Sequence, residues 1–115
     1  MVRFCKELDL KKILLIVLSL FLIVGCSKNG KYTEYYVNGQ KEKEGTWIDG
    51  ELDGLFTSWY LTGLKEYEIT YKDGKNDGLE TFWSENGQKE NEGILKDGEL
   101  VEVIGRWNWD GSVKE

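Results

Sequence analysis

The hydrophobic positions of the chain fall into two patterns. Residues 13–24 form an apolar run that only Ser19 interrupts, and four basic residues precede it. This run of 12 residues is shorter than the roughly 20 that a membrane-spanning helix needs, whereas a secretory signal has an apolar segment of about 7–15 residues. The pattern predicts an N-terminal signal helix, with residues 1–25 as the signal peptide.

Beyond residue 31 the apolar positions come in short runs rich in Tyr, Trp, Thr, Ile and Val, separated by dipeptides that end in glycine. Such runs favour β-strands, and Asn-Gly or Asp-Gly between them favours two-residue type I′ hairpin turns. A two-residue turn at Thr62-Gly63 would place Trp59 opposite Glu66. The expected strands are residues 32–37, 41–48, 55–61, 65–72, 79–85, 89–96 and 102–108, with a stub after Gly111.

The strands repeat with a step of 24 residues, so that residues 24 positions apart form columns. A repeated unit that cannot bury its own apolar face stacks on its neighbours and grows along one axis. We therefore expect an all-β fold: an elongated single-layer antiparallel sheet of repeated β-hairpins, preceded by the signal helix. The clearest columns are Tyr35, Trp59, Trp83 and Trp107; Gly39, Gly63, Gly87 and Gly111; and Gly50, Gly74 and Gly98.

The domain organisation follows from these patterns. Residues 26–31 would form a short tether and residues 32–115 the repeat domain. A further column, Gly30, Gly54 and Gly78, breaks at Glu102, where Val101-Glu102 replaces an Asp-Gly dipeptide. The third unit is therefore expected to be a capping unit.

The signal run ends at Ile23-Val24-Gly25-Cys26, which resembles a bacterial lipobox. The resemblance implies diacylglyceryl attachment to the Cys26 sulfur and cleavage between Gly25 and Cys26. The alternative is an uncleaved membrane anchor; in both cases the chain is tethered to a membrane. Two or three acyl chains anchor a protein stably, whereas one alone is marginal. The expected location is the cell membrane or the outer membrane, with the protein exported and lipid-anchored.

Charge and composition narrow the function. The chain has no histidine, which removes the commonest general base and the commonest zinc ligand. We expect no enzyme, no metal and no cofactor. Four of the 15 Lys+Arg and two of the 21 Asp+Glu lie in residues 1–25, so the remainder carries a net charge of −8. A domain of this net charge is repelled by the phosphate backbone of a nucleic acid, so nucleic acid is not an expected partner.

The order of motifs resembles a known repeat family. An aromatic pair, Asn-Gly, Gly-x-aromatic and Asp-Gly-x-x-Asp-Gly follow one another over residues 29–111, as in the MORN-repeat variant family. The resemblance implies successive β-hairpins in an elongated antiparallel sheet. Bacterial members are described as antitoxin components of toxin-antitoxin systems, so an antitoxin-like protein that neutralises a partner toxin is one expectation. The other is an envelope lipoprotein whose sheet is a non-catalytic interaction module for a protein or peptide partner.

Two sets of carboxylates are candidates for chemistry. Paired aspartates in the Asp-Gly loops, such as Asp73 and Asp77, suit calcium, but turn geometry explains them better, because calcium needs six to eight oxygens. The column of Glu42, Glu66 and Glu90 would lie beside the aromatic column, as carboxylates do in a glycosidase. Solvated strand faces explain these repeated glutamates better.

The aromatic columns are the most plausible contact surface. We take Tyr35, Trp59, Trp83 and Trp107 as the candidate interaction surface, with Leu55, Leu61 and Leu79 on the same face. The alternative interpretation, which the sequence favours, is that these rings form the core of the sheet. The other face would carry Tyr32, Trp47, Phe56, Tyr60, Tyr67, Tyr71 and Phe82.

Overall fold

The computed structural model describes residues 28–115. The predicted signal helix, the cleavage position and Cys26 lie outside these residues. The repeat domain begins at Gly30, two residues earlier than expected, so that the last two residues of the predicted tether belong to the first strand. Within the described range no helix is long and apolar enough to cross a membrane.

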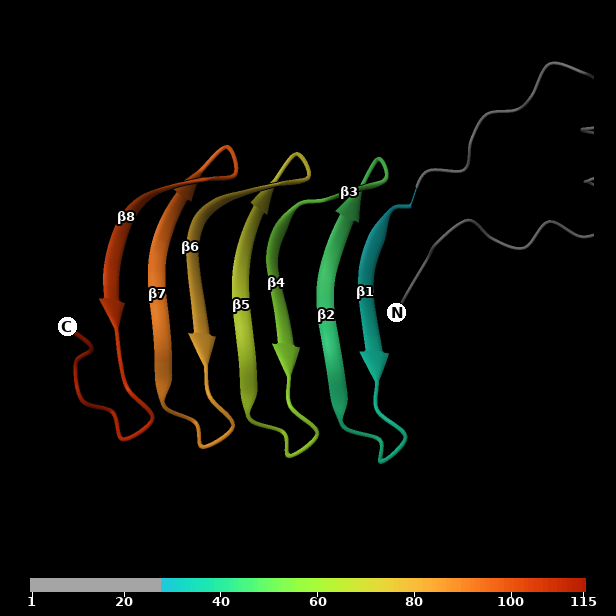
Figure 1. Ribbon diagram of the computed structural model, residues 1–115. Helices are drawn as coiled ribbons and strands as arrows, with labels where there is room; N and C mark the ends of the chain where they lie inside the picture. Colours follow the sequence, from blue (N-terminus) through green and yellow to red (C-terminus); the bar gives the residue numbers. More distant parts are fainter. Residues whose placement is uncertain (1–27) are drawn as a thin grey trace, which may run out of the picture.

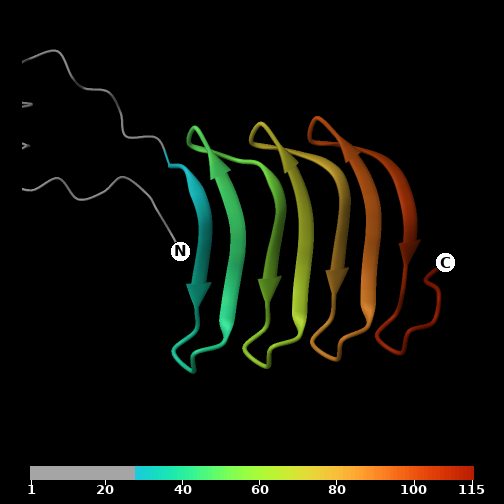
Figure 2. The same cartoon turned by 180° about the vertical axis from the view of Figure 1, so that it is seen from behind.

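The described chain forms one antiparallel sheet, which confirms the all-β prediction (Figure 1). Figure 2 shows the same sheet from behind, and residues 28–115 place no second layer on either face. Strands follow the order β1-β2-β4-β5-β6-β7-β8, and the short β3 pairs with β2, so β1 and β8 are the two edges. The strands are β1 (Gly30–Tyr35), β2 (Lys41–Ile48), β3 (Glu51–Leu52), β4 (Gly54–Trp59), β5 (Lys65–Lys72), β6 (Lys75–Trp83), β7 (Lys89–Lys96) and β8 (Glu99–Arg106).

The Asp-Gly dipeptides form type I′ turns, as predicted, but β6 already begins at Lys75, four residues before the expected strand over 79–85, and ends at Trp83. Asp49 and Gly50 both have positive φ, 48° and 83°, and Ile48 pairs directly with Glu51 across the turn. The same geometry recurs at Asp73-Gly74 and Asp97-Gly98, whereas at Asp110-Gly111 only the glycine has positive φ. Aspartate is suited to these positions because its short side chain tolerates the left-handed region.

The Asn-Gly turns differ from the prediction. Only the glycine has positive φ, 87° at Gly39, and the loop contains three residues. The Gly39 N–H donates to the Tyr36 carbonyl at 2.9 Å, and the Tyr36 N–H donates to the Gln40 carbonyl at 2.8 Å. This is the three-residue hairpin in which a type I turn is followed by a left-handed glycine. The Asn38 side chain helps to close it by accepting the Gln40 N–H at 3.0 Å.

The extra loop residue changes the register of each hairpin. Trp59 pairs with Lys65 and Ser58 pairs with Tyr67, so Glu66 is the unpaired residue of a bulge. The Glu66 carboxylate accepts a hydrogen bond from the Ser58 hydroxyl at 2.8 Å. Because consecutive strand residues face opposite sides, Glu66 lies on the face away from Trp59. The predicted Trp59–Glu66 pairing is therefore wrong.

The C-terminal strand departs from the earlier units in the predicted place. Gly54 and Gly78 have positive φ, 94° and 123°, whereas their column partner Glu102 has an ordinary backbone. β8 consequently follows β7 from Glu99 to Arg106, with only local irregularities. The expected strand over 102–108 thus begins earlier and ends earlier, and the stub forms as a bridge between Trp107 and Val113.

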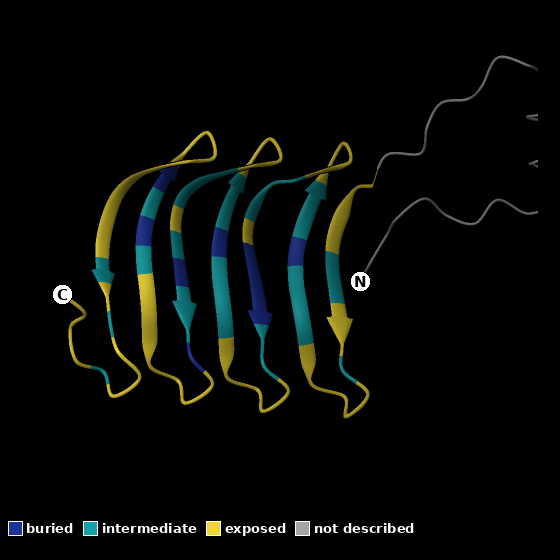
Figure 3. Ribbon diagram, in the orientation of Figure 1, coloured by how far each residue is buried: buried dark blue, intermediate teal, exposed yellow. Residues whose placement is uncertain are grey.

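Burial is concentrated in the middle of the sheet (Figure 3). Phe56, Ile69 and Leu95 are the buried apolar residues of the described range. Many other large apolar side chains, including Leu55, Leu79 and four of the eight residues of β8, are exposed. A single layer cannot cover both of its faces, so apolar surface stays open to solvent on both sides.

Candidate interaction surfaces

One face of the sheet carries an alternating row of aromatic rings and lysines. Lys41 Nζ lies 5.7 Å from the centre of the Trp59 ring, and Lys65 Nζ lies 5.6 Å from that of Trp83. Lys89 makes the same contact with Trp107 at 5.9 Å. These distances are within the range of cation–π attraction. We call this the aromatic–lysine row, and its side the ladder face.

Each lysine of the row is also held by a carboxylate. Lys65 Nζ lies 2.8 Å from Glu68 Oε2, which accepts the Thr57 hydroxyl at 3.4 Å. Lys89 and Glu92 repeat the arrangement at 2.7 Å. The hydrogen bond from Lys89 lowers the pKa of Glu92 below its usual value. Exposed pairs of this kind contribute about 0–1 kcal/mol each, so the row adds modest stability at every hairpin junction.

The predicted surface residues all lie in or beside this row. Trp59, Trp83 and Trp107 are half-buried, while Tyr35 at the N-terminal end is 59% exposed. The ring faces are partly covered by lysine, which limits stacking by a partner. The column of glutamates that includes Glu66 was expected opposite the rings, but lysines occupy those positions, so the glycosidase-like arrangement does not form.

The hairpin turns are tied laterally to one another. At one end, the Tyr36 hydroxyl donates to the Trp59 carbonyl at 2.6 Å, and the Tyr60 hydroxyl donates to that of Trp83 at 2.7 Å. At the other end, the Asp97 N–H donates to the Asp77 carboxylate at 3.2 Å. This bond is the main cause of a lowered pKa at Asp77, with Lys96 as a second cause.

The aspartates therefore serve the turns. Asp53 accepts the N–H of Asp73 in the same way, at 3.3 Å. Over residues 28–115 no group of three or more acidic or cysteine side chains is placed to hold a metal ion.

The opposite face, which we call the aromatic face, carries a cluster of packed rings in its middle. Phe56 stacks on Tyr67 with ring centres 6.1 Å apart, and Tyr67 contacts Phe82 at 5.9 Å. Tyr71 meets the edge of Phe56 at 6.1 Å. Such pairs add about 0.5–1.5 kcal/mol beyond their area burial. The prediction that these rings share a face is confirmed. Within the described chain, these are the ring–ring contacts that pack side chains on this face.

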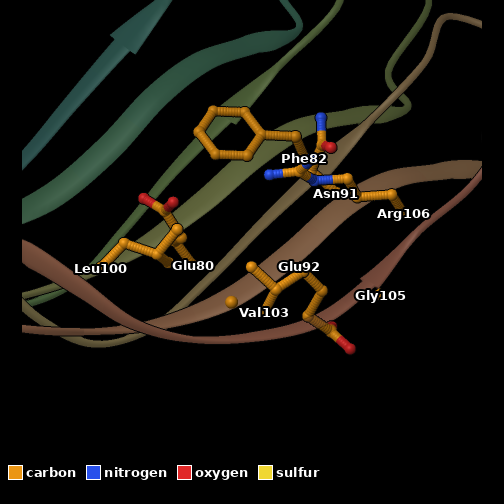
Figure 4. A pocket seen from close by; sticks show the side chains of 9 residues that line it. Glu80, Phe82, Asn91, Glu92, Leu100, Val103, Gly105 and Arg106 are labelled. Atoms are coloured by element: carbon orange, nitrogen blue, oxygen red, sulfur yellow. The ribbon is translucent and has the colours of Figure 1, made fainter.

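Towards β8 the aromatic face is hollowed. A hollow of about 210 Å³ lies there, and Figure 4 shows its lining side chains. Glu80 and Leu100 lie at one end, and Asn91 and Arg106 lie together beyond Phe82. Burial raises the pKa of the Glu80 carboxyl above its usual value.

Sequence reasoning missed this hollow. The signal in the sequence is a change of residue type within three columns. The columns are aromatic one unit earlier and become polar at Glu80, Asn91 and Arg106. Comparison with family models, with curated proteins and with solved structures finds no match to the chain.

Proposed function

We propose that the protein is an exported, lipid-anchored binding module without catalytic activity, whose repeat sheet contacts a protein or peptide partner. The observation that carries the proposal is the open single layer, in which large apolar side chains remain exposed on both faces. Monomeric proteins rarely expose contiguous apolar surface without an interaction to serve. The Ile23-Val24-Gly25-Cys26 motif supports the anchor on Cys26.

The anchor is tested by metabolic labelling with palmitate and by the intact mass of the mature chain. We expect label on the wild type and none on Cys26→Ser, with cleavage after Gly25 also lost in the variant. Cys5→Ser is the matched control, because Cys5 lies within the signal and leaves with it. Loss of label in Cys5→Ser alone would contradict the anchor. If neither label nor cleavage occurs in the wild type, the antitoxin-like alternative takes first place.

The contact surface is tested by photo-crosslinking in living cells. A photoreactive residue at Tyr71 samples the aromatic face. One at Leu55, which is 55% exposed, samples the ladder face, where lysines partly cover the rings, and serves as the control. We expect a discrete adduct from Tyr71 that is lost when Cys26→Ser removes the anchor. Equal adducts from both positions, or none from either, would contradict a binding face on the rings.

A further inference from the structure

The hollow arises because four columns change character together. Phe56, Tyr67, Ile69 and Phe82 form the packed centre of the aromatic face, and the residues 24 positions later are Glu80, Asn91, Gly93 and Arg106. Their backbone pairings match: Phe56 pairs with Ile69 as Glu80 pairs with Gly93, and Tyr67 pairs with Phe82 as Asn91 pairs with Arg106. These equivalent positions therefore carry an aromatic cluster in one unit and a polar hollow in the next. Beside the hollow the register also shifts by one residue, because Gly93 pairs with Val103, whereas Ile69 pairs with Glu80 one unit earlier.

The polar side chains that replace the aromatic ones do not bond to one another. Among residues 28–115, the side chains of Glu80, Asn91 and Arg106 make no hydrogen bond or ion pair. All three nevertheless line one hollow together with Phe82, Leu100 and Val103. The Glu80 carboxylate is half-buried and has no partner in the described chain, so a cation that pairs with it from outside the chain gains binding free energy.

The floor of the hollow is set by a glycine. A side chain at Gly93 would meet the Glu102 carbonyl oxygen and the Leu100 side chain, both at 2.9 Å from its first carbon. Gly93 thus adds no side chain beside Glu80, and Leu100 lies against it instead. Its counterpart one repeat earlier, Ile69, is a buried side chain paired with Phe56. Other lining atoms come from Glu92, whose carboxylate points away from the hollow, toward Thr81 and Lys89 on the ladder face (Figure 4).

The charges of the hollow are opposite and separated. Glu80 and Arg106 lie two strands apart and about two residues apart along the strand direction, a Cα separation of roughly 12 Å from strand geometry. Both side chains reach toward the space between them, so a ligand with charges a few ångströms apart can contact both. At about 210 Å³ the hollow is below the roughly 300–1,000 Å³ of sites for drug-sized ligands.

We propose that this hollow binds a dipeptide-sized zwitterion, with its ammonium group at Glu80, its carboxylate at Arg106 and Asn91, and its apolar side chains against Phe82, Leu100 and Val103. A planar guanidinium pairs well with a carboxylate, and an amide donates to the same group. The inference rests on the proposed role as a binding module and not on the lipid anchor.

The test is calorimetric titration of the full chain in detergent with alanyl-leucine as the probe. We expect the free dipeptide to bind, and the N-acetylated and C-amidated forms each to bind about tenfold or more weakly, because each loses one charge-assisted contact. Glu80→Gln should weaken the free dipeptide by a similar factor and abolish its preference over the acetylated form. Arg106→Gln should likewise weaken binding of the free dipeptide and abolish its preference over the amidated form.

Two exposed charges serve as matched controls. Glu102→Gln changes a carboxylate on the ladder face of β8, and Lys114→Gln changes a cation beyond it, so neither should alter the affinity. Absence of binding, or equal binding of free and blocked dipeptides, would overturn the inference. If Cys26 palmitate and the Tyr71 adduct persist in that case, the proposed function stands and the ligand alone is wrong.

Discussion

The middle of the aromatic face and its C-terminal end share one backbone frame but differ in what they place on it. In the middle, Phe56 and Tyr67 stack and Ile69 is buried beside them. At the C-terminal end, Glu80 and Asn91 stand in the same columns and leave a hollow. The β4–β5 hairpin pairs in the same way as the β6–β7 hairpin, so this part of the frame does not depend on the aromatic packing. The next pairing differs, because β7–β8 shifts register at Gly93 and at Leu95.

The ladder face shows what keeps the frame constant. Lys65 and Glu68 lie under Trp83, and Lys89 and Glu92 repeat that arrangement under Trp107. The lateral bonds between turns also continue to the end, with the Asn86 side chain donating to the Trp109 carbonyl at 2.7 Å. The comparison teaches that one face and the turns specify the sheet, which frees the other face to change its chemistry.

The largest expected effect is on the free energy of unfolding, to which the packed middle of the aromatic face should contribute more than the hollow. Phe56→Ala removes a nearly buried ring and should lower the free energy of unfolding by about 3 kcal/mol. Its column partner variant, Glu80→Ala, should change it by less than about 0.5 kcal/mol or raise it, since no partner in the described chain is lost. Urea denaturation of the full chain followed by tryptophan fluorescence measures both. Equal losses would show that the hollow is a packed part of the core.

A smaller effect is expected where the backbones of the two regions diverge. Gly78 has φ of 123°, and a side-chain carbon added there would lie 3.2 Å from Thr70 Cβ. Gly78→Ala should therefore cost about 1–3 kcal/mol. The same denaturation measurement on Glu102→Ala, in an ordinary strand conformation, is the control and should show a change within about 0.5 kcal/mol. A tolerated Gly78→Ala would mean that the bend before β6 is not required.

The smallest effect concerns pH. Burial raises the pKa of Glu80 in the folded chain, so folding favours the protonated carboxyl. The wild type therefore has this contribution in full below the unfolded pKa of about 4.3 and loses it as pH rises through the folded value. Glu80→Gln should be slightly more stable than the wild type at neutral pH, with the difference vanishing near pH 4. Thermal unfolding across this range measures it, and a difference that grows toward acid pH would contradict the assignment.

Local chemistry explains which parts of the fold were predictable. The 24-residue step, the strands and the type I′ turns at Asp49-Gly50 all follow from residue type and spacing. The three-residue loops did not follow, because Asn38 is equally suited to both turn forms and the choice depends on hydrogen bonds that only the folded sheet provides. One of these is the contact from Asn38 to the Leu61 carbonyl in the next hairpin, at 3.2 Å.

The register error had a direct consequence for the predicted site. One extra loop residue exchanged Glu66 for Lys65 beside Trp59, which turned an expected acidic surface into a lysine row. The hollow was missed for a different reason. Each column break is visible singly, but only the pairing of three strands shows that Glu80, Gly93 and Arg106 meet in one place.

Among the long strands, each pairs only with those that are adjacent to it in chain order. Such a topology has low contact order, and sheets of this kind assemble quickly from local hairpins. As the chain emerges from its N-terminal end, the β1–β2 hairpin can close before the last repeat has been synthesised. β8 docks after the other described strands, and the hollow against it exists only once β8 has docked. Ligand binding at Glu80 and Arg106 would thus distinguish molecules in which β8 is docked from those that already possess the rest of the described sheet.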